Sequence, residues 1–355
     1  MSRFVQIHIL TSYPPANLNR DDTGRPKSAL MGDSMRLRVS SQSLKRAWRT
    51  SDLFEGALAG HVGTRTKSMG KEVFKALKAG GINEKLAREW AKQIAERFGK
   101  LKSEKKTEND ADLEIEQLAH FSPEEKDAID RLVQRLVEQR DAPPAEDELK
   151  LLVKPRRAVD IAMFGRMLAD AAEFNVDAAV QVSHAVTVHK APVEDDYFSA
   201  VDDLNTREQT GAGHIGERGY GAGLFYLYLC IDRELLQENL GGDAALAQRA
   251  LAALVEAATK VSPTGMQNSF ASRAYAAYVL AEKGDQQPRS LVQAFYKPVA
   301  AYGQDNDILA KSVSALTKRC DNFDKVYGPC ADARCSLDVE KGEGSLEALV
   351  KFVSE

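Results

Sequence analysis

The segment Phe4-Val5-Gln6-Ile7-His8-Ile9-Leu10 opens the chain with the pattern of a β-strand. Successive side chains of a strand point to opposite faces, so Val5, Ile7 and Ile9 share one face. The other face takes Phe4, Gln6, His8 and Leu10. The next strong strand patterns lie far along the chain, so we expect this strand to pair with strands from the second half.

The rest of the chain divides into stretches of distinct character. Pro14 and Pro15 predict a loop after the first strand, and residues 40–43 supply N-cap side chains for a helix from about Leu44. Apolar residues at three- and four-residue spacing make 57–180 almost wholly helical, most clearly over 69–98 and 124–140. Further strands are expected at 35–39, 180–188 and 224–231, and further helices at 244–258, near 290–297 and near 305–318, before a loop-rich tail.

This order of elements predicts an α+β fold. The helical stretch 57–180 separates the early strands from the late ones, which leaves a split sheet with helices on one side. No repeat of 20–50 residues is visible, which argues against a solenoid.

The composition is that of an ordinary globular protein. Its 355 residues include 43% hydrophobic and 28% charged side chains, with a net charge of -4 and a pI of about 6.0. No apolar run approaches the roughly 18 residues of a membrane span, and the first residues do not resemble a signal peptide, so we expect a cytoplasmic protein without membrane contact. An acidic total does not exclude nucleic acid, because a binding groove needs only a local excess of Lys and Arg.

No catalytic set, metal site or cofactor is predicted. The cysteines are Cys230, Cys320, Cys330 and Cys335; they form no Cys-x-x-Cys pair, which favours reduced thiols over a zinc site. His184 and His189 are five residues apart and point to opposite faces of a strand. The acidic pairs at 195–196 and 202–203 could bind Mg²⁺, but a solvated acidic turn is the expected alternative.

The short helix after residue 43 gives the clearest indication of a binding site. Lys45 and Arg49 are four residues apart and share a helix face, with Arg46 beside them. Arg36 and Arg38 precede the helix on the short strand. Positive charges and free backbone N–H groups at a strand-to-helix junction favour phosphate. A solvated basic face on an ordinary helix is the alternative, and the pattern alone does not separate the two.

Residues 211–223 are rich in glycine, and the first six fit Gly-x-Gly-x-x-Gly. A dinucleotide fold would place that motif between a strand and a helix, whereas here a polar stretch precedes it and a strand follows. A flexible hairpin or extended loop is the better interpretation, since glycine tolerates unusual dihedral angles. Tyr197 and Phe198 stand in the polar stretch 190–220, where they could stack on bases, for roughly 1–3 kcal/mol per base, or pin the loop to the domain.

Five segments resemble the CasC family, the backbone subunit of the type I-E CRISPR surveillance complex called Cascade. They are FVQIHILTSYPPANLNRDDTGRPK at 4–27, RLRVSSQSLKRAWR at 36–49, DIAMFGRMLA at 160–169, AAVQVSHAVTVH at 178–189 and DYFSAVDDL at 196–204. Together they match the family in the right order through most of residues 1–260, and the last hundred residues match more loosely.

The resemblance implies an RNA-recognition-motif-like (ferredoxin-like) palm, a helical fingers insertion and a β-hairpin thumb. On this chain the palm takes residues 1–56, a strand at 181–189 and the region 224–355 with the C-terminus. The fingers take 57–180 and the thumb hairpin takes 190–223.

The resemblance also implies RNA-binding residues. The positions that match a hold on the guide backbone are Arg20, Lys27, Ser40, Gln42, Lys45 and Arg49, with Arg46 beside them. Met163 or Met167 on the palm and Phe198 on the thumb match a wedge that flanks a displaced base, and Tyr197 stands where a tryptophan is expected. Candidates to meet target DNA, with solvated surface charge as the alternative, are Lys100, Lys102, Lys105, Lys106, Lys150, Lys154, Arg156 and Arg157.

These expectations describe a non-catalytic subunit that polymerises along a guide RNA in antiviral defence. The guide would pair with invading DNA while the protein reads only backbone and shape. The expected partners are guide RNA, target DNA, further copies of the chain and other Cascade subunits. Two alternatives stay open: a metal-dependent ribonuclease that uses Asp202 and Asp203, and a protein scaffold without RNA contact.

Overall fold

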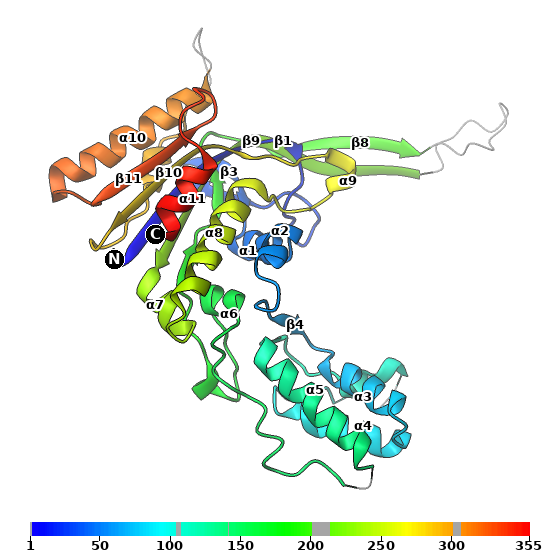
Figure 1. Cartoon of the computed structure of the whole chain (residues 1–355). Helices are drawn as coiled ribbons and strands as arrows, with labels where there is room; N and C mark the ends of the chain where they lie inside the picture. The colour runs from blue at the N-terminus through cyan, green and yellow to red at the C-terminus, as the bar shows by residue number, and fades with distance from the viewer. Residues whose placement is uncertain (1, 104–107, 141, 201–213, 301–306) are drawn as a thin grey trace, which may run out of the picture. The chain divides into compact units, whose positions relative to one another are not determined.

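The computed structural model describes residues 2–103, 108–140, 142–200, 214–300 and 307–355. The chain forms two compact units (Figure 1). The first, here called the sheet unit, consists of Met1–Glu55, Gln181–Arg233 and Leu251–Glu355. The second, called the helical unit, consists of Gly56–Val180 and Glu234–Ala250, so residues 234–250 join the stretch that the sequence marks as an insertion.

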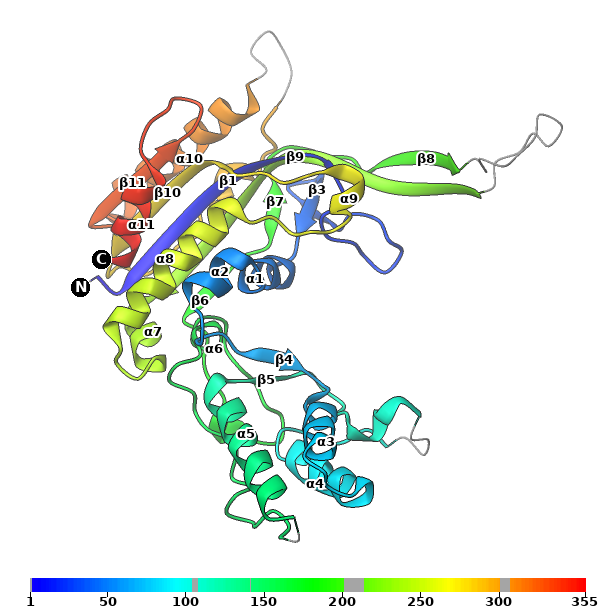
Figure 2. The ribbon, with the colours of Figure 1, turned by 45° about the vertical axis from the view of Figure 1, so that its right-hand side comes forward.

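Among the described residues, a nine-stranded sheet is the framework of the sheet unit (Figure 2). Its main path runs β11-β10-β1-β9-β7-β3-β2, and each neighbouring pair on this path is antiparallel. β6 and β8 pair with β9 beside the path. The strands are β1 Phe4–Ala16, β2 Ser28–Met31, β3 Ser34–Val39, β6 Val180–Val182, β7 Ala185–Thr187, β8 Glu194–Ala200, β9 His214–Asp232, β10 Ala276–Gly284 and β11 Ala333–Asp338.

Strand β1 lies between two strands from the second half of the chain. Ile7 stands opposite Leu229 of β9 on one side and Ala281 of β10 on the other. The predicted pairing of the first strand with late strands is therefore confirmed.

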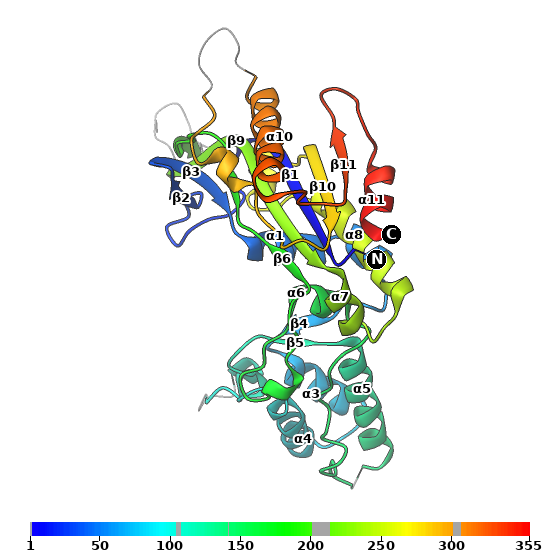
Figure 3. The same cartoon turned by 90° about the vertical axis from the view of Figure 1, so that its left-hand side faces the viewer.

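Both faces of β1 are buried. The three aliphatic side chains of the first face are at most 1% exposed, and His8 and Leu10 on the second face are fully buried. Helix α10 (Ile308–Tyr327) covers the second face, where its Leu316 joins the core around Leu10. Helix α8 (Ala244–Lys260) runs along the other face (Figures 2 and 3). The prediction of helices on one side only is wrong, because the polar residues of the second face are buried in a network.

Glu282 of β10 is the centre of that network. Its carboxylate is fully buried and accepts hydrogen bonds from Arg289 Nη1 at 2.7 Å and Arg334 Nε at 2.9 Å, and it lies 3.1 Å from His8 Nε2. Burial opposes ionisation, but hydrogen bonds from His8 and Arg289 outweigh it and hold the pKa of Glu282 far below its usual range. The network thus ties β1, β10 and β11 together through one ionised carboxylate.

Strand β1 also extends further than the sequence predicts. It continues through Pro14 and Pro15 to Ala16, where the prolines predict a loop. Its register with β9 shifts between Tyr13 and Ala16. The prolines therefore lie at an irregularity of the ladder, where their missing N–H groups are tolerated.

The C-terminal third holds more regular structure than the sequence predicts. Strands β10 and β11 lie in stretches expected to be loops, and α11 (Leu346–Ser354) lies in the expected tail. The helix expected near 290–297 is a short 3-10 turn at Val292–Phe295. Strand β10 pairs with β1, at the other end of the chain, and β11 pairs with β10. Because these pairing partners are distant in sequence, no local pattern predicts β10 and β11.

The helical unit has its own apolar core. Leu77, Trp90 and Ile94 are among its buried residues. Residues 142–180 are mostly irregular, however, so the prediction of an almost wholly helical stretch over 57–180 is wrong for this part. The helical unit and the links to it contain α2 Asp52–Ala57, β4 Thr64–Thr66, α3 Met69–Ala79, α4 Glu84–Glu96, a 3-10 turn at Glu108–Leu113, β5 Ala119–Phe121, α5 Pro123–Glu138, α6 Val159–Phe164, a 3-10 turn at Ala172–Phe174 and α7 Arg233–Asn239. None of the helices in the described ranges is long and apolar enough to cross a membrane.

We predict that Glu282→Gln destabilises the sheet unit by about 3 kcal/mol at pH 7, because it leaves the largely buried guanidinium of Arg289 without its anion, whereas Arg334 keeps Asp324. A carboxyl with a lowered folded-state pKa stabilises the fold above its unfolded pKa of about 4.3 and loses this effect as pH falls. The difference in free energy of unfolding between wild type and variant should therefore become smaller from pH 7 to pH 3.

Urea unfolding followed by Trp48 fluorescence measures this difference. A Trp90→Phe background leaves Trp48 as the single tryptophan, and Trp48 lies in the sheet unit. Glu340→Gln, at an exposed carboxylate, is the matched control. An equal and pH-independent effect of both substitutions would contradict the role given to Glu282.

Candidate nucleic-acid interface

Helix α1 (Ser41–Arg49) organises the candidate site in the sheet unit. It begins directly after β3 because the Ser40 hydroxyl accepts a hydrogen bond from Ser43 N at 3.3 Å and caps the first turn. Leu44 and Trp48 anchor its buried face. Residues three and seven apart share a face, so two further faces remain. We call them the first flank, with Gln42, Lys45 and Arg49, and the second flank, with Ser43, Arg46 and Thr50.

Cations gather around His184 at the start of the first flank. Arg38 Nη1 lies 3.2 Å from His184 Nδ1, and Ser41 N donates to the same atom at 3.3 Å. Burial and the charges of Arg38, Lys27 and Lys45 lower the pKa of His184. The four side chains therefore share one positive region at a helix N-terminus, the surrounding that binds phosphate. His184 is 143 residues from Ser41 in sequence, so no local pattern assigns it to this site.

Arg36 does not belong to this region, contrary to its expected place beside the phosphate site. Its side chain is fully buried, and its guanidinium donates to the carbonyl oxygens of Thr187 at 2.9 Å and Phe295 at 3.0 Å. Arg36 therefore fastens β3 to β7 and to the turn at Val292–Phe295, while Arg38 faces His184.

The loop that carries Arg20 and Lys27 is tied down at both sides. Asn19 Oδ1 accepts from Ser40 N at 2.9 Å, which joins the loop to the start of α1. Asn17 Nδ2 donates to Gly219 O at 2.9 Å, which joins it to β9. These bonds hold two predicted RNA-binding cations at fixed places beside the helix.

Strands β8 and β9 form a hairpin that projects from the sheet (Figure 1). Phe198 stands opposite Gly216, and a Cβ on Gly216 would lie 2.3 Å from the ring, so the ring lies directly on the glycine. The guanidinium of Arg218 lies over the same ring, 4.5 Å from its centroid. Tyr197 is 69% exposed. The hairpin thus presents one aromatic side chain held in place and a second one in solvent.

The glycines of this segment serve close packing. Gly216 and Gly221 adopt ordinary strand dihedrals, and a Cβ on Gly221 would lie 2.6 Å from a methyl group of Leu37. The expectation of a flexible loop with unusual dihedral angles is wrong for these two residues. Gly211 and Gly213 lie outside the described residues.

An open cavity of about 980 Å³ lies along the second flank of α1. Arg20 and Arg46 line it. A neighbouring cavity of about 390 Å³ shares Arg20 and Gly24 with it and reaches Arg218 of the hairpin. Asp195 and Glu217 line the second cavity too, and Arg25 pairs with Asp195 at 2.9 Å, while Arg218 lies over the Phe198 ring.

The two candidate methionines lie in the helical unit, on either side of a chain reversal. Met163 is fully buried in α6, whereas Met167 is 82% exposed. Gly165 has φ +81° between them, a left-handed conformation that favours glycine. Arg166 then points inward, with both Glu125 oxygens 2.8 Å from its Nη1. This buried ion pair holds Met167 outward; the sequence expectation had placed the methionine on the palm.

Of the eight basic residues expected to meet target DNA, four have acidic partners within the helical unit. The pairs are Lys100–Glu116 at 3.3 Å, Lys102–Glu114 at 2.6 Å, Lys150–Asp147 at 2.6 Å and Arg157–Asp127 at 3.3 Å. Hydrogen bonds from Lys102 and Lys71 lower the pKa of Glu114 to about 2. Lys154 and Arg156 pair with no carboxylate of the described residues, and Arg156 packs against Gly241. Lys105 and Lys106 lie outside those residues.

The arrangement suits non-covalent binding of phosphates. Among the described residues, no group of three or more His, Cys, Asp or Glu side chains could hold a metal ion. The four cysteines are free thiols. Asp202 and Asp203, the candidate acids of a ribonuclease, lie outside the part of the chain that the structure describes.

Comparison with known proteins gives matches over nearly the whole chain. A family model described as "CT1975-like protein" matches residues 5–351. A solved chain described as "CRISPR RNA-guided surveillance complex, pre-nicking" is 30% identical, with 99% of both chains covered and a TM-score of 0.86. A second, described as "CRISPR RNA-guided surveillance complex", is 27% identical, with 99% of both chains covered and a TM-score of 0.74. Comparison with curated proteins gives no match.

We predict that Lys45→Gln raises the pKa of His184, because it removes one of the positive charges that disfavour the imidazolium. An NMR titration of the His184 ring protons measures the change. Lys318→Gln, at an exposed lysine of α10, should leave that pKa where it is in wild type. If Lys45→Gln leaves the pKa of His184 unchanged, Lys45 does not belong to the positive region.

Proposed function

Since this chain belongs to the CT1975-like protein family, we propose that it is a non-catalytic subunit of a CRISPR RNA-guided surveillance complex and holds the backbone of the guide RNA. The family resemblance noted in the sequence is confirmed by the match over residues 5–351. The observation that carries the proposal is the positive region around His184 at the start of α1, with Lys27, Arg38 and Lys45.

The first flank of α1 is the proposed clamp for the guide backbone. Gln42, Lys45 and Arg49 follow one another along it, and the capped N-terminus adds backbone N–H groups. Such groups recognise phosphates and carry no preference for base sequence. A clamp of this kind accepts guides of any sequence, which leaves recognition of the target to base pairing.

The parts of the fold have proposed counterparts in this role. The sheet unit would be the RNA-recognition-motif-like palm, the helical unit the fingers, and the β8–β9 hairpin the thumb. Copies of the chain would follow one another along the guide, each reaching its neighbour with the hairpin. Phe198 on the hairpin and Met167 on the helical unit are the proposed wedge, because Met163 is fully buried.

We predict that Lys45→Ala combined with Arg49→Ala weakens guide RNA binding and its dependence on salt. Each lost phosphate contact lowers the slope of log K against log salt by about 0.7 for a single strand, so the double variant should lose about 1.4. The measurement is the affinity of the purified chain for labelled single-stranded RNA between low and physiological salt.

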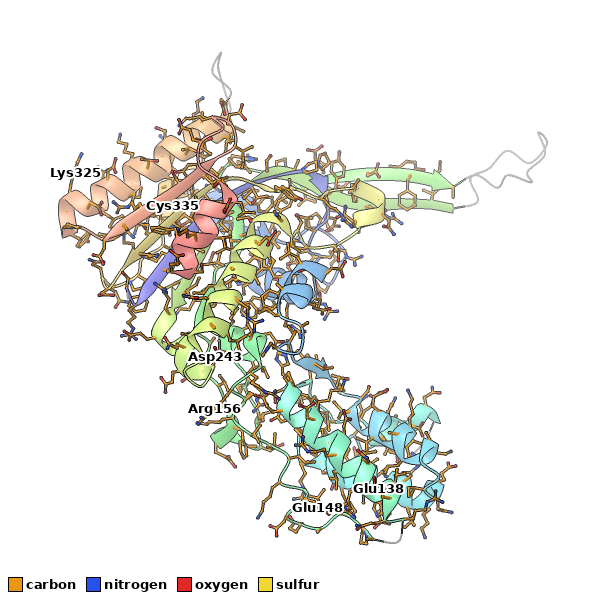
Figure 4. The ribbon with its side chains drawn as sticks, viewed as in Figure 1. Glu138, Glu148, Arg156, Asp243, Lys325 and Cys335 are labelled. Carbon is orange, nitrogen blue, oxygen red and sulfur yellow. The ribbon has the colours of Figure 1, made fainter. Side chains whose placement is uncertain are left out.

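The matched control replaces Lys318 and Lys325 by alanine. Both are exposed lysines of α10, and Lys325 projects from the end of that helix in Figure 4. If both double variants and wild type show the same slope of log K against log salt, the proposed clamp is contradicted. RNA-free wild type with salt-insensitive self-assembly would favour the protein scaffold, and Mg²⁺-dependent cleavage of bound RNA that is lost in Asp202→Asn would favour the ribonuclease.

We predict that Gly216→Ala impairs the wedge and spares the clamp. The new methyl group would lie 2.3 Å from the Phe198 ring, so the ring must leave its place on the hairpin. Chemical probing of guide RNA in the assembled complex should show regularly spaced reactive nucleotides in wild type and weaker reactivity there in the variant. Gly56→Ala, whose added Cβ has open space, is the control. Unchanged probing with both Gly216→Ala and Phe198→Ala would exclude the wedge.

A further inference from the structure

The large cavity on the second flank of α1 has a wall that the proposed clamp does not use. This wall is the segment 260–273, which follows α8 and includes the short helix α9 (Gln267–Phe270). We call it the far wall. The second flank and the loop that carries Arg20 also line this cavity.

The far wall is fixed in place at several points. Gly265 packs so closely on the loop that a Cβ there would lie 2.3 Å from Leu18 O. Ser262 Oγ donates to Ala274 O at 3.2 Å and accepts from Ala274 N at 3.3 Å. Phe270 packs on Tyr220 of β9, with ring centroids 6.1 Å apart. The segment is therefore a defined surface beside the base of the hairpin.

Two residues of the far wall adopt a backbone conformation that side chains disfavour. Met266 has φ +50° and Ala271 has φ +48°, both in the left-handed region. The contacts of Gly265, Ser262 and Phe270 hold the segment in this shape. Arg273 lies two residues after Ala271 and lines the cavity.

Three arginines line this cavity without a carboxylate partner. Arg20, Arg46 and Arg273 form no ion pair with any acidic side chain in the described ranges, whereas Lys260 is already paired with Glu256 at 2.6 Å. Asp21, Asp22 and Asp52 also line the cavity; Asp21 accepts from the hydroxyl and amide of Thr23 in its own loop. The planar guanidinium group binds phosphate through two parallel N–H donors, so three unpaired arginines around one open cavity suit a phosphodiester strand.

We infer that the far wall is a second binding site for nucleic-acid backbone, in which Arg273 contributes a phosphate contact to the cavity that Arg20 and Arg46 also line. This inference rests on the proposed function and extends it from one flank of α1 to both. A nucleic acid fits better than an acidic peptide because the cavity continues, through Arg20 and Gly24, to Arg218 and the aromatic hairpin. The phosphates come either from the guide RNA or from target DNA, which share this chemistry.

Arg273→Ala tests the inference in two binding measurements. The first measures binding of labelled single-stranded RNA by the free chain, and the second measures binding of single-stranded target DNA by the RNA-loaded assembly, both as a function of salt. Loss of one phosphate contact should lower the salt slope by about 0.7 in one of them. A change in the RNA measurement identifies the guide as the source, and a change only in the DNA measurement identifies the target.

Two further variants separate charge from structure. Arg273→Lys keeps the positive charge and should keep the salt slope, and Arg131→Ala removes an exposed arginine of α5 and should change neither measurement. Unchanged slopes for Arg273→Ala in both measurements overturn the inference. The same holds if polyglutamate, and not nucleic acid, loses affinity in Arg273→Ala.

The design also separates this inference from the proposed function. If Lys45→Ala with Arg49→Ala lowers the slope while Arg273→Ala does not, the clamp stands and the far wall is excluded. If wild type binds no RNA at any salt concentration, the proposed function fails together with the inference.

Discussion

The pairing of β1 with β9 is the constraint on which the rest of the sheet unit depends. Their register runs from Phe4 opposite Asp232 to Ala16 opposite Gly221, and β9 then continues without a break into its pairing with β8. The same strand is therefore both a central member of the buried sheet and one arm of the projecting hairpin. Any shift of register in the core would move Phe198, and Asn17, which bonds to Gly219, would move the loop that carries Arg20 with it.

The distribution of ion pairs explains how an acidic chain can present a basic surface. In the helical unit, four of the six described lysines and arginines singled out in the sequence have carboxylate partners within 3.3 Å. Around α1, Arg20, Arg46 and Arg273 line one cavity and pair with no carboxylate of the described residues, whereas Arg25 of the neighbouring cavity pairs with Asp195 at 2.9 Å. The net charge of -4 is thus a sum over two different populations of side chains.

Local patterns predicted the elements that depend on local chemistry. The alternation at residues 4–10 and the Ser40 cap before α1 were both visible in the sequence, although α1 begins three residues earlier than expected. Side chains whose role depends on distant partners were not predictable. Arg36 and Arg38 are two residues apart in β3 and so share one face of the strand, yet only Arg36 is buried. Its guanidinium donates hydrogen bonds to the carbonyl oxygens of Thr187 and Phe295. His184 joins the candidate site through a fold contact that spans 143 residues, and Arg273 lies in a segment without a recognisable motif.

The position of β1 in the sheet also determines the order in which the chain can fold during synthesis. β1 leaves the ribosome first, but its partners β9 and β10 end only at Asp232 and Gly284. At roughly 5–20 residues per second, the nascent strand waits on the order of ten seconds or longer for both neighbours. The helical unit, whose residues are mostly contiguous, is complete in large part well before then. The strand β1, which the folded protein covers on both faces, thus stays without its neighbours throughout this interval.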